Sequence, residues 1–184
     1  MSKSAIEKLS DETAAAQWLV GLGVDQPKRA LANLREISDS GLSTDSVQAL
    51  LQRVELKIPQ LSDADRALNN LERFVASSSD VTTEILERND QAFEGLLTIF
   101  STSQYLSDLL IRDPDRFQTC WQSNLISQSN LIRIVCGEID NATSHSEAML
   151  VLRQFKHDNI LRIAIYDLIY SCLLYTSPSP RDRG

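Results

Sequence analysis

Apolar residues recur at three- and four-residue spacing along almost the whole chain, which is the period of amphipathic α-helices. Runs of β-branched residues are short, and the chain has only six glycines and five prolines. The clearest apolar stripes are Ala15/Trp18/Leu19/Leu22, Ala30/Leu31/Leu34/Ile37, Val47/Leu50/Leu51/Val54 and Ala67/Leu68/Leu71/Phe74/Val75. This pattern predicts an all-α fold.

The boundaries of the expected helices follow from capping residues and helix breakers. Pro27 suits the first position of a helix, and Pro59 is expected to stop another. The run from Ser77 to Asp80 is expected to be a loop, and Ser101 to Ser103 a capping region. The expected helices cover about 11–22, 27–38, 45–57, 62–76, 81–88, 90–100, 103–111, a turn from 114 toward 121, 128–139 and 144–171.

The last expected helix changes character along its length. Its first half is amphipathic, but the second half is apolar around nearly its whole circumference. The residues concerned are Ile160, Leu161, Ile163, Ala164, Ile165, Leu168 and Ile169. A helix that is apolar all round is normally buried on every side. We therefore expect further sequence, beyond this helix, to cover it.

The chain is acidic, with 18 basic and 25 acidic side chains among its 184 residues. Nucleic acid is not an expected partner, because no stripe of Lys and Arg with interleaved aromatics offsets the repulsion from a polyanion. The longest apolar stretch, residues 160–174, is interrupted by Arg162 and Asp167 and falls short of the roughly 20 residues of a membrane span. The N-terminus lacks the features of a signal peptide. We expect a cytoplasmic protein without a membrane segment.

Candidate chemical groups are few and have structural explanations. The pairs Asp63/Asp65 and Asp113/Asp115 could hold Mg²⁺ for nucleotidyl transfer. However, both lie at expected helix starts, where acidic residues are favoured by the helix dipole alone. The chain has no Gly-Ser turn, GxGxxG, GxxxxGK or HExxH motif. The sequence therefore predicts no catalytic, cofactor-binding or metal-binding residue within this chain.

The cysteines and histidines do not form a metal-ligand pattern. Cys120 and Cys136 match neither a zinc nor a redox spacing, and we expect both to be buried small hydrophobes. His145 lies with Glu147 in an expected helix start, and His157 on an expected solvated face. A metal site needs three or four converging donors, so neither histidine is expected to be a ligand.

Residues 172–184, CLLYTSPSPRDRG, resemble translated sequencing-adapter DNA. The first six fit the codons TGT CTC TTA TAC ACA TCT, which resemble the mosaic end of a library-preparation transposon, and 178–182 fit CCG AGC CCA CGA GAC of the adapter that follows. We expect the native sequence to stop at Tyr170 or Ser171 and the tail to be disordered; a native Ser/Pro/Arg tail is the alternative. Leaving out Arg181, Asp182 and Arg183, 16 basic and 24 acidic side chains remain.

Two segments carry a family resemblance. Residues 100–115, FSTSQYLSDLLIRDPD, resemble FGTSPFLSDLLLRHPE in the N-terminal part of bacterial bifunctional glutamine synthetase adenylyltransferase/adenylyl-removing enzymes. Residues 152–168, LRQFKHDNILRIAIYDL, are similar to LRRFRRREMLRIALRDL of the same family and depart from it at Gln154, Asp158 and Asn159. Weaker support comes from PKRALANL at 27–34.

The resemblance implies that residues 1–171 are a helical region preceding a nucleotidyltransferase-like domain. The metal-binding carboxylates and the Gly-Ser turn of that domain would follow this region, so the chain by itself would be inactive. The parent enzyme would use ATP to attach AMP to a tyrosine of glutamine synthetase and would remove it by phosphorolysis. Its expected cofactors are Mg²⁺ and ATP, neither bound by this piece, and its expected partners are glutamine synthetase and a PII-type nitrogen regulatory protein.

Two other classes of protein are alternatives to this one. An all-α adaptor that binds a partner helix in a groove would also account for the helices and the acidity, but not for two motif matches in the right order. A helical ligand-binding or metal-storage bundle would need inward-facing Glu and His at i, i+3 spacing, and the sequence shows no such set.

Overall fold

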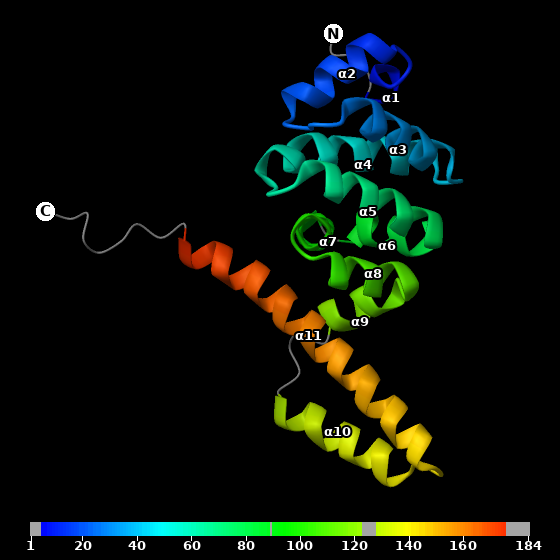
Figure 1. Cartoon of the computed structure of the whole chain (residues 1–184), viewed down its shortest axis with the longest axis vertical. Helices are drawn as coiled ribbons and strands as arrows, with labels where there is room; N and C mark the ends of the chain where they lie inside the picture. Colours follow the sequence, from blue (N-terminus) through cyan, green and yellow to red (C-terminus); the bar gives the residue numbers. More distant parts are fainter. Residues whose placement is uncertain (1–4, 89, 123–127, 176–184) are drawn as a thin grey trace, which may run out of the picture. The chain divides into compact units, whose positions relative to one another are not determined.

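The computed structural model describes residues 5–88, 90–122 and 128–175 (Figure 1). These residues form helices and contain no strand, which confirms the all-α prediction. The helices are α1 (Ala5–Lys8), α2 (Glu12–Gly21), α3 (Pro27–Asp39), α4 (Thr44–Lys57), the short 3-10 helix η1 (Ile58–Gln60), α5 (Ala64–Ser77), α6 (Ser79–Arg88), α7 (Asp90–Thr102), α8 (Gln104–Arg112), α9 (Asp115–Gln122), α10 (Gln128–Asp140) and α11 (His145–Tyr175).

The chain divides into two compact units, residues 1–115 and 116–184. In the first unit, the helices are stacked in chain order from α1 and α2 to α8 (Figure 1). Helices α3, α5 and α8 lie side by side and run in the same direction, because residues of each contact residues about 35 to 40 positions later in the next. Helices α4 and α7 pair in the same way through Arg53–Asp90 and Lys57–Glu94.

The first unit is built around a continuous apolar core. The predicted stripes of α3, α4 and α5 are buried, with Leu34, Leu50 and Leu71 fully inaccessible. The rings of Phe74 and Phe100 pack at 5.5 Å between centroids, joining α5 to α7. Fully burying a side chain of this size contributes about 1.5–3 kcal/mol, so this core is the main source of stability in the unit.

Side-chain caps fix several helix starts in the first unit. The carboxylate of Asp11 accepts from Thr13 N and Ala14 N at the start of α2. Asp63 accepts from Arg66 N at 2.8 Å at the start of α5, and Ser43 caps α4. A cap of this kind contributes about 1 kcal/mol. Three of the predicted boundaries therefore have a direct chemical cause.

Three details of the first unit differ from the predictions. The short helix α1 was not predicted. Pro59 ends α4, but the chain continues as η1, because proline is tolerated in a first helical turn. The expected loop from Ser77 to Asp80 is reduced to Ser78, whose hydroxyl accepts from Val81 N at 3.3 Å and starts α6 at once.

The second unit contains α9, α10 and α11, and α10 packs against α11. Burial is sparse here: the buried apolar residues among those described are Phe117, Cys120, Leu161 and Ile165. On α11, Leu161 and Ile165 are buried, whereas Ile163 is 62% exposed, so the apolar second half of this helix is only partly covered within the described residues. The side chains of Leu168 and Ile169 lie outside the described residues.

The segment interpreted as an adapter tail begins within the last helix. Helix α11 continues through Tyr175, and residues 176–184 lie outside the described part of the chain. Within the described helices, none combines the length and the hydropathy that crossing a membrane requires.

Candidate functional site

The first motif segment, residues 100–115, contains the end of α7, the whole of α8 and, between them, a short junction. A single residue, Ser103, separates the two helices, and its hydroxyl accepts from Leu106 N at 3.3 Å as the cap of α8. The buried hydroxyls of Ser101 and Ser107 donate to Thr98 O and Ser103 O at 2.9 and 2.8 Å. The serines of this motif therefore act on the backbone of the junction.

Two side chains of α5 bind the last carbonyls of α7. Arg66 Nε donates to Ser101 O at 2.9 Å, and Arg66 Nη2 donates to the same oxygen. Asn70, which is fully buried, donates to Phe100 O at 3.1 Å. Carbonyls in the last turn of a helix have no partner within it, so these donors satisfy groups that the fold would otherwise leave buried and unbonded.

The same junction continues outward as a polar network. Gln104 accepts from Asn70 Nδ2 at 3.3 Å and donates to Asp108 at 3.0 Å. Arg73 binds Asp108 at 3.1 Å. The roles of Arg66, Arg73 and Asn70 were not predicted from the sequence. The sequence held one indication of this network, because Asn70 is a polar residue within the apolar stripe of its helix.

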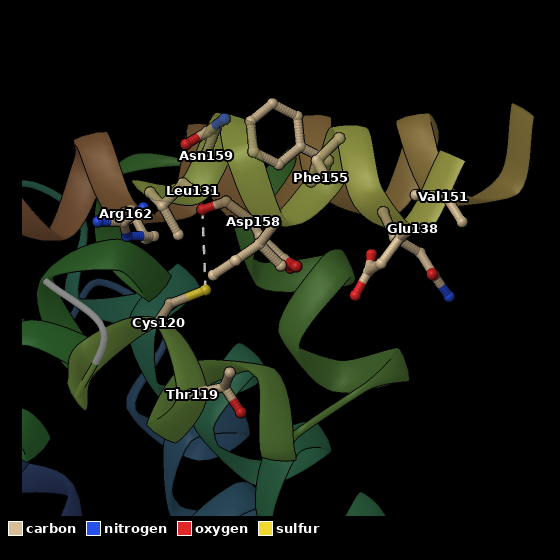
Figure 2. Close-up of a pocket in the computed structure, with 12 residues that line it drawn as sticks. Thr119, Cys120, Leu131, Glu138, Val151, Phe155, Asp158, Asn159 and Arg162 are labelled. Carbon is tan, nitrogen blue, oxygen red and sulfur yellow. Dashed lines mark hydrogen bonds between the residues drawn. The ribbon is translucent and has the colours of Figure 1, made fainter. Parts of the chain in front are cut away.

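The second motif segment, residues 152–168, lies in α11 and contacts α9. Arg116 of α9 forms an ion pair with Asp158, and the thiol of Cys120 donates to Asp158 O at 3.7 Å (Figure 2). The side chain of Arg116 is 15% exposed and that of Asp158 is 39% exposed. Asp158, one of the departures from the family pattern, therefore links the two helices of this unit.

A cavity of about 360 Å³ lies beside this ion pair, within the second unit (Figure 2). Its wall is mixed, with Leu131 and Val135 from α10 and Phe155 from α11 next to Asp158 and Arg162. An apolar cavity with a few polar groups can hold a small ligand. Its walls include no paired nucleophile and base, so it does not indicate a reaction.

The two aspartate pairs do not provide a metal site. The carboxylate of Asp65 accepts from Asp25 N and Gln26 N at 2.8 and 2.9 Å, while that of Asp63 caps α5. Asp113 is the residue at which α8 ends, and Asp115 begins α9. Because the carboxylates of Asp63 and Asp65 are engaged by main-chain N–H groups, this pair is not arranged to hold Mg²⁺.

Cysteines and histidines also do not converge. Among the described residues, no group of three His, Cys, Asp or Glu side chains could hold a metal ion. Cys120 is buried as expected, but the same expectation was wrong for Cys136, which is exposed. Cys136 follows Val135, which faces the cavity, and the turn of the helix places it on the outer side of α10.

His145 begins α11 and is exposed, as expected for a helix start. The start itself is fixed by its neighbours: Glu147 accepts from Thr143 N and from Thr143 Oγ1, both at 2.7 Å, and Ser144 Oγ accepts from Glu147 N. The hydrogen bonds from Thr143 lower the pKa of Glu147. This is a reciprocal cap, which confirms the predicted helix start.

The other perturbed carboxyl group lies in the first unit. Glu55 of α4 binds Lys8 at 2.6 Å and accepts from Trp18 Nε1 at 3.1 Å. The hydrogen bond from Lys8 is the main cause that lowers the pKa of Glu55, and burial opposes it. The Lys8 ammonium also lies 5.2 Å from the centre of the Trp18 ring. This cluster ties α1 and α2 to α4.

Comparison with known protein families gives a match over the second half of the chain. Residues 93–174 match the model of the family described as glutamate-ammonia ligase adenylyltransferase. The matched range contains the α7–α8 junction and the whole second motif segment. No curated protein and no solved structure matches the chain. The family is linked to adenylylation of glutamine synthetase, and the match covers a little under half of the chain.

Proposed function

We propose that this chain is the helical N-terminal region of an enzyme that adds AMP to, and removes AMP from, a tyrosine of glutamine synthetase. The observation that carries the proposal is the family match over residues 93–174. It includes both motif segments that led to the same family from the sequence. The N-terminal half of such an enzyme performs the removal, so this region would belong to the adenylyl-removing half.

The chemistry of the proposed parent would take place outside residues 1–171. The carboxylates of Asp63 and Asp65 accept from main-chain N–H groups, and we propose that Mg²⁺ and ATP would be held by a nucleotidyltransferase-like domain that follows. The role proposed for the present residues is to carry and position that domain. On this proposal the chain by itself has no adenylyl-transferring or adenylyl-removing activity.

The tail is part of the same proposal. Residues 172–184 would be adapter-derived, because eleven consecutive residues, 172–182, fit transposon and adapter codons in one frame. The native protein would then continue differently after Tyr170 or Ser171. The partners proposed for the parent are glutamine synthetase and a PII-type regulatory protein, in the cytoplasm.

The first test is the sequence of the intact gene beyond codon 171. The proposal expects a strand with a Gly-Ser turn, followed some ten residues later by an Asp-x-Asp pair. An early stop codon would contradict it.

The second test measures release of ADP from adenylylated glutamine synthetase with Mg²⁺ and inorganic phosphate. The present chain should release none, while the protein from the intact gene should release it. Activity of residues 1–171 alone would refute the proposed division of labour.

A further inference from the structure

The first unit contains a sequence repeat that neither motif segment includes. Residues 29–34 read RALANL and residues 66–71 read RALNNL, at an offset of 37 residues. Both copies lie in the first turns of helices that pack side by side in the same direction, α3 and α5. Arg29 therefore corresponds to Arg66, and Asn33 to Asn70.

In the second copy, this Arg/Asn pair binds main-chain carbonyls of the same chain. Arg66 and Asn70 donate to Ser101 O and Phe100 O, the carbonyls that end α7. These hydrogen bonds place the C-terminal end of α7 directly against the first turns of α5. The Arg66/Asn70 pair thus binds the last main-chain carbonyls at the C-terminus of a helix.

In the first copy, the corresponding place is an open cleft. A cleft of about 280 Å³ is lined by residues of α3 and by the start of α5, and no residue of α4 contributes to it. The connection from α4 to α5 runs through η1 and Leu61 to Asp63, so it is longer than the single residue between α7 and α8. The C-terminal end of α4 therefore does not line the cleft.

The donors of the first copy face this cleft. Arg29 and Asn33 both line it; Arg29 is exposed and Asn33 half-exposed. Arg29 Nη2 donates to Asn69 Oδ1 at 2.7 Å, which holds the guanidinium across the cleft and uses one of its five N–H donors. The acidic residues of the cleft are engaged otherwise, because Asp65 accepts from Asp25 N and Gln26 N and Asp63 caps α5.

We propose that the cleft between the starts of α3 and α5 binds the C-terminal end of a helix from a partner protein, through its last main-chain carbonyls. Arg29 and Asn33 would donate to two successive carbonyls, as Arg66 and Asn70 do to those of α7. Hydrogen bonds from a charged donor to carbonyls without partners are among the stronger ones in proteins. This proposal does not depend on the catalytic role proposed above.

The test uses the full chain and a helical peptide that reproduces the end of α7. A side-chain-stapled, amidated peptide ending in the sequence of residues 97–102, LTIFST, is titrated into ¹⁵N-labelled protein. The side-chain signals of Arg29 Nε and Asn33 Nδ2 should shift and saturate. The matched control peptide continues the helix by two alanine-rich turns, so that its Phe and Ser carbonyls are bonded internally, and it should not produce these shifts.

Variants separate recognition from general charge attraction. Arg29→Ala, or Asn33→Asp, which replaces a donor by an acceptor, should weaken binding at least about tenfold. Lys28→Ala removes a neighbouring exposed charge on the same helix and should change binding less than twofold. Circular dichroism verifies that each variant is folded. The proposal would be overturned if the Arg29 and Asn33 signals did not shift. It would also be overturned if the extended peptide bound equally well, or if Lys28→Ala weakened binding as much as Arg29→Ala.

Discussion

At the scale of single residues, Asn70 has the most demanding position in the first unit. It is fully buried and donates to the carbonyl of Phe100. Replacing it by alanine would leave that carbonyl buried without its donor, which costs about 1–3 kcal/mol. We expect Asn70→Ala to lower the free energy of unfolding by that amount in urea denaturation.

The repeat supplies a matched control for this change. Asn33 occupies the same repeat position but is half-exposed, so Asn33→Ala should cost no more than about 0.5 kcal/mol. Equal losses for the two variants would show that the bond to Phe100 O is not what makes Asn70 important.

Glu55 gives the first unit a predictable response to acid. Its pKa is lowered in the folded protein, mainly by the hydrogen bond from Lys8. The stability that this contact adds is therefore present above the pKa of the unfolded chain and is lost as the pH falls through the folded pKa. Glu55→Gln should lose about 0.5 kcal/mol near neutral pH, a figure reduced for solvent screening, and less at an acidic pH, where Glu55 of the folded protein becomes protonated.

The measurement is urea denaturation of both proteins at the two pH values. Glu36→Gln, at an exposed position on α3, should show no such pH-dependent difference. A loss for Glu55→Gln that is the same at both pH values would contradict this explanation.

The roles of individual residues were predictable only where they are local in sequence. Acidic residues at helix starts suggested caps, and Asp63 is one. The partners of Arg66, Asn70 and Arg116 lie 30 to 42 positions away. Periodicity and spacing do not identify such partners, because they depend on which helices become neighbours.

At the scale of helices, amphipathic periodicity predicted the longer elements within a few residues. The stripes of α3, α4 and α5 are the buried faces observed. The errors occurred where one side chain decides the local backbone, as at Ser78, or where a segment is a single turn, as in α1. For α11 the composition predicted a second half that needs further sequence to cover it, and within the described residues Leu161 and Ile165 are buried while Ile163 is exposed.

The link between α9 and α11 can be tested by removing one charge. Asp158→Asn should weaken the contact with Arg116 and destabilise the second unit by about 1 kcal/mol or less, the range for partly exposed ion pairs. Amide hydrogen exchange in α9 should become faster. Asp167→Asn, at an exposed position on the same helix, should leave the exchange rates of α9 unchanged. If both variants changed these rates equally, the Arg116–Asp158 ion pair would have no specific role in linking α9 to α11.

At the scale of the whole molecule, charge and core are unevenly distributed. The first unit has 19 acidic and 11 basic side chains, a net charge of −8, whereas the second has 6 and 7. All but four of the buried apolar residues among those described belong to the first unit. The first unit should therefore be the more resistant of the two to local unfolding.

Amide hydrogen exchange on the full chain tests this distribution. The amides of α5 should exchange about two orders of magnitude more slowly than those of α10, which has no buried residue among those described, because local opening is least costly where few apolar contacts are lost. Comparable protection in both helices would contradict the inferred location of the stable core.

The repeated Arg-Ala-Leu-x-Asn-Leu segment also shows how far a short sequence determines what its side chains do. The two copies lie near the starts of helices that pack side by side in the same direction. In the later copy, Arg66 and Asn70 donate to the carbonyls that end α7, whereas in the earlier copy Arg29 and Asn33 line a cleft. A segment of this kind therefore specifies hydrogen-bond donors, but the helices around it decide which groups those donors bind.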